Sequence, residues 1–163
     1  MKILPTLFIV LALCASQAAL SQSYKEDFYK AHVFIDYEMY ELALPAFLEL
    51  NRNYPGNANI RGIIGYLYLQ TPDQKHKSLD YLKNCKSELS AYYKFGNHKE
   101  SGTPLESIWF LGKAYYENKQ YDKAIALFQE YKDTLRNGNK KDRMIIEEDI
   151  RQSQIAKKNT KSS

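Results

Sequence analysis

Two stretches of this sequence place small and aromatic residues at the same intervals, and this repeated spacing is the strongest constraint on its fold. The matching residues are Ala31, Phe34, Tyr40, Ala43 and Phe47 in the first stretch, and Gly112, Tyr115, Tyr121, Ala124 and Phe128 in the last. Twelve residues separate Ala31 from Ala43, and twelve separate Gly112 from Ala124. Apolar positions three and four apart indicate amphipathic helices, so each stretch predicts two helices joined by a turn.

Gly112 lies inside a predicted helix, where glycine costs about 1 kcal/mol relative to alanine. We interpret it as a packing glycine that lets a second helix cross close by. The matching small residues should act in the same way, and aromatic residues should fill the space beside them. The small residues are Ala31, Ala43, Gly65, Ser78, Gly112 and Ala124, and the aromatic residues are Phe34, Tyr68 and Tyr115.

A middle segment follows the same pattern with one extra residue. Gly65 lies 34 residues after Ala31, while Ser78 falls one place late, which puts the insertion in the turn "TPDQKHK". The next segment, "SAYYKFGNHKESG", has the Gly, Asn and Ser content of a loop. After it, Thr103-Pro104-Leu105-Glu106 predicts a helix start, with a capping box and a proline in the first turn.

A helix, turn, helix unit repeating every 34 residues resembles the tetratricopeptide repeat. The resemblance implies an all-α solenoid of helical hairpins in one domain over residues 22–158, with three repeats near residues 24–57, 58–91 and 105–138. Pro55 should end the second helix of the first repeat. The third repeat lacks such a proline, so its second helix is expected to end near Asn137, with Gly138 as its C-terminal cap.

The segment "KKDRMIIEEDIRQSQIAKKN" is expected to form a capping helix over residues 140–157, followed by a flexible tail at 159–163. A repeat solenoid exposes an apolar end unless a final helix covers it. Met144, Ile146 and Ile150 are therefore predicted to pack on the third repeat.

The N-terminus, Met1-Lys2 followed by "ILPTLFIVLALCA", is typical of a secretory signal peptide over residues 1–21 with cleavage after Ser21. The alternatives are an uncleaved anchor and acylation at Cys14, although Leu13 is larger than a lipoprotein signal requires. Cleavage would leave Cys85 as the remaining cysteine, which excludes an intrachain disulfide, and we expect Cys85 to be a buried small hydrophobe.

Charge and motifs argue against several function classes. The chain carries a formal charge of +4, which is concentrated toward its C-terminal end and does not suggest a nucleic-acid-binding face. His32, His76 and His98 are scattered, so no metal site is expected. The sequence shows no nucleophile elbow and no glycine-rich phosphate loop. We therefore expect neither catalysis nor a cofactor or small-molecule substrate, and the remaining hypothesis is recognition of another protein.

In tetratricopeptide solenoids the first helix of each repeat lines a concave face that binds peptides or partner helices. The resemblance places these positions at Phe28, His32, Asp36, Asn59, Tyr66, Gln70, Trp109, Lys113, Tyr116 and Glu117. Tyr and Trp are frequent in binding hot spots. The competing interpretation is that Trp109 and Tyr66 pack on the loop or on a neighbouring helix. A carboxylate clamp of the chaperone-tail type is not expected, because Phe28, His32 and Glu106 occupy its positions.

The segments "ALSQ", "YELALPAFLEL", "SIWFLGKAYYENKQYDKAIALFQEY" and "DIRQSQIAKKN" resemble the N-terminal part of outer-membrane-associated proteins of Bacteroidetes-type bacteria. Those proteins continue with a β-propeller and an OmpA-like peptidoglycan-binding domain, and some are implicated in type IX secretion. The resemblance implies a periplasmic or outer-membrane-associated adaptor for another envelope protein, with peripheral membrane association. The alternatives are an outer-membrane lipoprotein, a shortened relative of the OmpA-type proteins, and an envelope hydrolase or an accessory to one. The present sequence stops at Ser163, so wall anchoring is not carried over.

Overall fold

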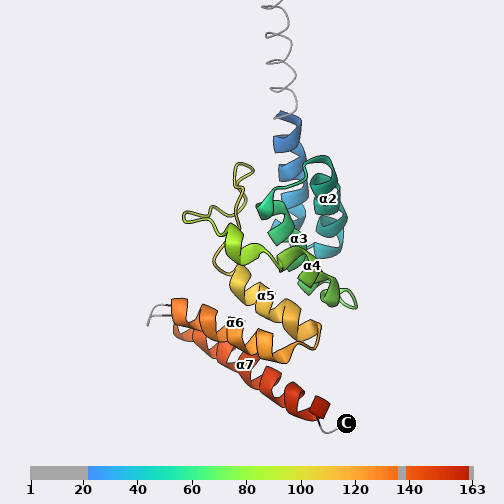
Figure 1. Cartoon of the computed structure of the whole chain (residues 1–163). Coiled ribbons are helices and arrows are strands. Elements are labelled where there is room, and N and C mark those ends of the chain that lie inside the picture. Colours follow the sequence, from blue (N-terminus) through green and yellow to red (C-terminus); the bar gives the residue numbers. More distant parts are fainter. Residues whose placement is uncertain (1–21, 136–138, 162–163) are drawn as a thin grey trace, which may run out of the picture.

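The computed structural model describes residues 22–135 and 139–161, and these residues form an all-α protein without a β-strand. None of the helices in these two ranges is both long and apolar enough to cross a bilayer. The predicted signal peptide, the acylation site at Cys14 and the cap at Gly138 lie outside the described residues. The N-terminal helix, described over 22–36, is followed by α2 (Tyr40–Asn53), α3 (Ala58–Gln70), α4 (Ser78–Leu82), α5 (Ser107–Glu117), α6 (Tyr121–Thr134) and α7 (Lys140–Lys161). Figure 1 shows their order in space.

The turns that join the two most similar helix pairs have the same backbone hydrogen bonds. In the first turn, the amide of Glu38 donates to the carbonyl of Ile35 at 2.9 Å, with Glu38 at φ 56°. In the last, the amide of Lys119 donates to the carbonyl of Tyr116 at 2.9 Å, with Lys119 at φ 58°. The repeated sequence spacing therefore corresponds to a repeated backbone conformation.

Gly112 lies against the second helix of its pair, as the spacing predicted. A Cβ atom at this position would lie 2.6 Å from Cε1 of Phe128, which is much closer than an ordinary contact. Gly65 meets Leu82 of α4 in the same way. Both glycines are required by close helix crossings rather than by backbone conformation, because neither has a positive φ.

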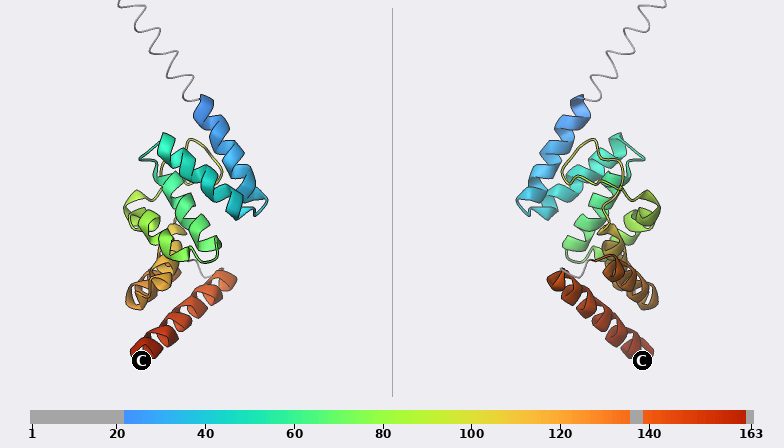
Figure 2. Two further views of the ribbon diagram at one scale, coloured as in Figure 1. Left: turned by 90° about the vertical axis from the view of Figure 1, so that its right-hand side faces the viewer. Right: turned by 90° about the vertical axis from the view of Figure 1, so that its left-hand side faces the viewer.

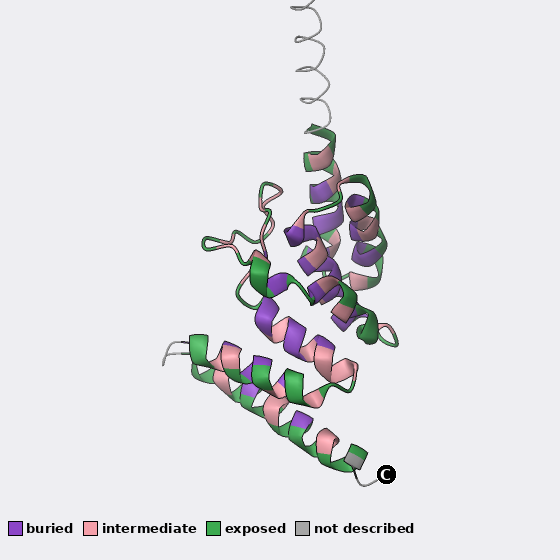
Figure 3. Ribbon diagram, in the orientation of Figure 1, coloured by how far each residue is buried: buried purple, intermediate pink, exposed green. Residues whose placement is uncertain are grey.

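The core consists of two clusters along the chain. One is built from the N-terminal helix, α2 and α3, and the other mainly from α4 to α7 with Leu69 of α3. The other predicted small residues at the crossings are buried: Ala31, Ala43, Ser78 and Ala124. Figure 3 shows that the buried positions concentrate on the faces where helices meet.

The segment between α4 and α5 departs from the predicted helix start. The short 3₁₀ turns Lys75–Lys77 and Cys85–Glu88 flank α4, and a long loop then leads to α5. The predicted capping box is wrong, because the Thr103 hydroxyl donates to the carbonyl of Cys85 at 2.9 Å and α5 begins only at Ser107.

Residues 90–102, called the strap below, form a loop whose ends are held together. The amide of Ser90 donates to the carbonyl of Thr103 at 2.8 Å, and the amide of Thr103 donates to the carbonyl of Glu88 at 2.7 Å. A Cβ atom at Gly102 would lie 2.8 Å from the Glu88 carbonyl oxygen, so the closure needs glycine there. None of the strap residues is fully buried.

The C-terminal helix α7 packs on α6, as expected, with a different inward face and different ends. Ile146 is 1% exposed and Ile150 is half-buried, whereas Met144 is 69% exposed, so the prediction that Met144 packs inward is wrong. The helix continues to Lys161, through part of the predicted tail, and α6 ends at Thr134 instead of near Asn137.

Candidate functional site

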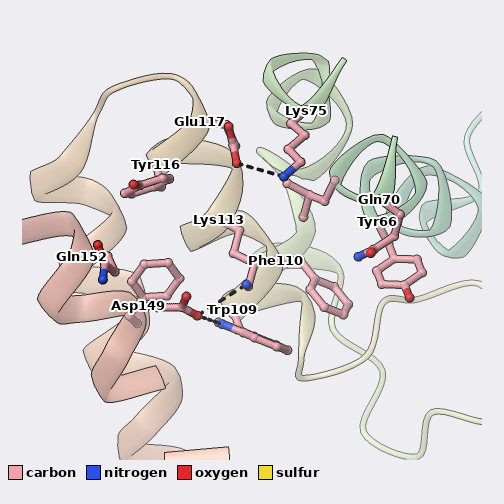
Figure 4. A pocket seen from close by; sticks show the side chains of 12 residues that line it. Tyr66, Gln70, Lys75, Trp109, Phe110, Lys113, Tyr116, Glu117, Asp149 and Gln152 are labelled. Atoms are coloured by element: carbon pink, nitrogen blue, oxygen red, sulfur yellow. Dashed lines mark hydrogen bonds and ion pairs between the residues drawn. The ribbon is translucent and has the colours of Figure 1, made fainter. Parts of the chain in front are cut away.

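A cavity of about 620 Å³ opens between α3, α5 and α7 (Figure 4). Its walls also include Lys75 from the 3₁₀ turn before α4. Six of the sequence-predicted binding residues line it, coming from two helices that are separated along the chain: Tyr66, Gln70, Trp109, Lys113, Tyr116 and Glu117. The structure thus brings the predicted residues of the second and third units to one place, apart from Asn59.

Trp109 is held in position by α7. Its Nε1 donates a hydrogen bond of 2.7 Å to Oδ2 of Asp149. The ammonium group of Lys113 lies 4.7 Å from the centre of the indole ring and 3.6 Å from the same carboxylate oxygen. The indole also stacks with Tyr131, with 6.3 Å between ring centres and 8° between planes. Trp109 therefore packs on neighbouring helices and also presents part of its surface to the cavity.

The charges of the cavity are arranged as two pairs. Lys113 pairs with Asp149, and Lys75 pairs with Glu117 at 3.8 Å. These side chains are partly exposed, so each pair contributes little to stability and mainly orients its partners. Burial, with smaller effects from Tyr121, Glu117 and Asp149, raises the pKa of Tyr116. The Tyr116 hydroxyl is protonated at neutral pH, as for an ordinary tyrosine, and can donate a hydrogen bond.

A second cavity of about 580 Å³ lies beside the first, beneath the strap. Tyr66 and Phe110 line both cavities, and their rings are 5.1 Å apart. The lining of the second cavity is mostly apolar, and Glu106 is the one charged residue among the described residues that form it. The two cavities thus meet at an aromatic pair, with balanced charges on one side and an apolar space on the other.

The predicted binding residues of the first unit do not form an open surface. Phe28 is fully buried and packs edge-on against Phe47, with 5.8 Å between ring centres, so it belongs to the core. His32 is also buried, as is Asn59 of the second unit. Asp36 is exposed beside His32, with Nδ1 of His32 and Oδ1 of Asp36 3.2 Å apart. The expectation of a continuous open face from Phe28 to Glu117 is therefore corrected to a face that is open only in its later part.

Several cavity residues were not identified from the sequence. Asp149, which anchors Trp109, lies in the acidic run Glu147-Glu148-Asp149, and such a run is typical of a solvated helix face. Phe110 and Lys75 also line the cavity. Trp109 and Phe110 are adjacent in sequence, and adjacent aromatic residues at the start of a helix were the one local signal that could have indicated Phe110.

The described residues contain no group of three His, Cys, Asp or Glu side chains that could hold a metal ion. Cys85 is buried, as predicted, and its Sγ donates to the carbonyl of Ser107 at 3.3 Å. Burial, more than the nearby Glu88, raises the pKa of the Cys85 thiol to about 12. Cys85 is thus a packed thiol rather than a nucleophile.

Comparisons with protein-family models, curated proteins and solved structures found no match to this chain.

Proposed function

We propose that this chain is a non-enzymatic adaptor of the tetratricopeptide type, which binds an extended segment of another protein in the cavity between α3, α5 and α7. The turns at Glu38 and Lys119 share their backbone hydrogen bonds from the end of one helix to the start of the next, at Ala43 and Ala124, and this agreement supports the repeat assignment. The crossings at Gly65 and Gly112 support it in the same way.

The observation that carries this proposal is the convergence of six residues, chosen from sequence, on one cavity. Aromatic side chains offer a large contact area at a low cost in conformational entropy, and Trp and Tyr dominate many binding hot spots. Asp149 and Lys113 already fix the indole of Trp109, so little ordering remains to be done when a ligand binds. The cavity volume suits one or two side chains of an extended peptide.

The proposed setting is the bacterial envelope, either the periplasm or the inner side of the outer membrane. This part of the proposal rests on the signal-like sequence of residues 1–21 and on the resemblance to envelope proteins. Export with cleavage predicts a mature chain that begins at Gln22, whereas the lipoprotein alternative predicts an acylated Cys14. Mass determination of the mature N-terminus separates the two.

The adaptor proposal is tested by photo-crosslinking in cells from position 116, with the same probe at the exposed position 123 as a control. We expect a discrete envelope protein to be captured from position 116 and not from position 123. Binding of that purified protein should weaken at least tenfold in Tyr116→Ala, which corresponds to about 1.4 kcal/mol, and should be unchanged in the exposed control Tyr37→Ala. Equal capture from both positions, or equal affinity of both variants, would refute the cavity as the binding site.

A further inference from the structure

The strap packs onto the surface that the first unit would otherwise present to a ligand. The hydroxyl of Tyr93 donates to Oδ1 of Asn59 at 2.7 Å, and the ring of Phe95 lies 4.8 Å from the ring of His32. Figure 2 shows the strap passing beside the N-terminal helix and α3. It thus occupies the part of the predicted binding face that lies between Asn59 and His32.

The strap covers this surface but leaves two of its buried polar atoms without a hydrogen-bond partner. Asn59 is 1% exposed and His32 is 5% exposed, yet Nδ2 of Asn59 and Nε2 of His32 have no hydrogen-bond partner. A Cβ atom at Gly96 would lie 3.3 Å from Nε2 of His32, so the strap backbone closes over the ring at this point. Buried polar groups in folded proteins are nearly always paired, and two unpaired groups beneath one loop therefore indicate a missing partner.

The two unpaired atoms are complementary to a polypeptide backbone. Nδ1 of His32 lies 3.2 Å from the Asp36 carboxylate, and this contact favours the tautomer that carries its proton on Nδ1. Nε2 is then an acceptor, while Nδ2 of Asn59 is a donor. An extended peptide supplies N–H and C=O groups at short intervals, and these are the kinds of group that the two atoms lack.

The strap sequence indicates the side chains that such a peptide would carry. Tyr93 and Phe95 face the surface, and Lys94 stands exposed between them. The second cavity lies beneath Tyr93 and Phe95, and its lining has Glu106 but no Lys or Arg among the described residues. The strap itself therefore shows an aromatic, basic, aromatic sequence, and the acidic residue in the cavity lining is compatible with the basic position.

We propose that residues 90–102 act as an internal pseudo-ligand, and that the surface beneath them binds an extended partner segment in which a basic residue stands between two aromatic residues. This inference rests on the proposed adaptor function and extends its site. Tyr66 and Phe110 line both cavities, so a segment that displaces the strap continues directly into the cavity of Trp109.

The test uses a fluorescein-labelled peptide with the strap's own sequence, SAYYKFGNHK, and the full-length chain. The double variant Tyr93→Ala/Phe95→Ala weakens the internal competitor, and we expect it to bind the peptide at least tenfold more tightly than the wild type by fluorescence anisotropy. The matched control is Tyr92→Ala, a strap tyrosine that is 89% exposed, and it should keep the wild-type affinity. A peptide with both aromatic residues replaced, SAYAKAGNHK, should not bind the double variant.

A second measurement needs no variant of the protein. Excess SAYYKFGNHK added to the wild type should speed hydrogen exchange of the strap amides, whereas SAYAKAGNHK should leave it unchanged. Equal affinity of the double variant and the wild type, equal binding of the two peptides, or strap exchange that does not respond to peptide would each overturn the inference. These outcomes are distinguishable from failure of the adaptor proposal, because crosslinking from position 116 reports on the other cavity.

Discussion

Replacing Gly112 with alanine tests the close crossing of α5 and α6. In an unobstructed helix this change stabilises by about 1 kcal/mol. Here the new Cβ would lie 2.6 Å from Cε1 and 2.7 Å from Cδ1 of Phe128, and this ring is buried and cannot swing into solvent. The helices would have to separate by roughly 0.8 Å to restore an ordinary contact, and overpacking of this kind costs about 1–3 kcal/mol. Taking the upper end, we expect a net loss of about 2 kcal/mol.

The assay is urea denaturation followed by circular dichroism at 222 nm, a wavelength at which helices have a strong negative ellipticity. The loss of stability is read from the shift of the urea midpoint at constant slope. The matched control is the same change in a Phe128→Leu background, where the smaller side chain leaves room for the methyl group. There Gly112→Ala should be neutral or should stabilise by up to about 1 kcal/mol, which gives a coupling energy of about 2–3 kcal/mol. An increase in stability from Gly112→Ala alone, or the same loss in both backgrounds, would refute the packing argument.

Three further predictions concern Cys85, Trp109 and α7. Because burial raises the pKa of Cys85 from 9.0 to about 12, the folded state holds this proton more tightly than the unfolded state. The free energy of unfolding should therefore be insensitive to Cys85 below pH 9 and should fall above it by up to about 1.4 kcal/mol per pH unit, as the difference between wild type and Cys85→Ala in pH-dependent denaturation would show. Asp149→Ala removes the hydrogen bond that holds the indole of the single tryptophan in its packed position. The fluorescence emission of Trp109 should therefore shift to the red, and an unchanged spectrum would contradict the role of Asp149 as the anchor of Trp109. Ile146→Ala should cost about 2–5 kcal/mol and Met144→Ala less than about 0.5 kcal/mol in thermal or urea denaturation, and similar losses would contradict the packing of α7.

The helix pairs could be predicted from the sequence because the signals that define them are local. The crossing at Gly112 follows from a spacing of small and aromatic residues within about two helices, and such spacing is readable along the chain. Tyr66, Trp109 and Tyr116, which line one cavity, were chosen through the resemblance to tetratricopeptide repeats. The inward face of α7 could also have been predicted correctly, because Met144 lies about 200° around the helix from Ile146 and cannot share its face.

The contacts of the strap and of Asp149 could not be predicted in this way. Phe95 meets His32, and Asp149 meets Trp109 across 40 residues, and no periodicity relates the members of either pair. The predicted helix start at Thr103 was wrong for a similar reason. The Thr103 hydroxyl donates to the carbonyl of Cys85, and only the tertiary fold brings these two groups together. The composition of residues 90–102 predicted a loop, but it did not indicate that Tyr93 and Phe95 pack on the N-terminal helix and α3.

The closure of the strap at both of its ends has a consequence for competition. A segment tethered in this way is present at its own binding surface at an effective concentration in the millimolar range, whatever the concentration of the protein. The hydrogen bonds of Ser90 and Thr103 keep that tether short. A free peptide of equal intrinsic affinity would have to reach a similar concentration to displace it. A weak or dilute ligand therefore cannot displace the strap, whereas a partner that is already held nearby by a second contact can.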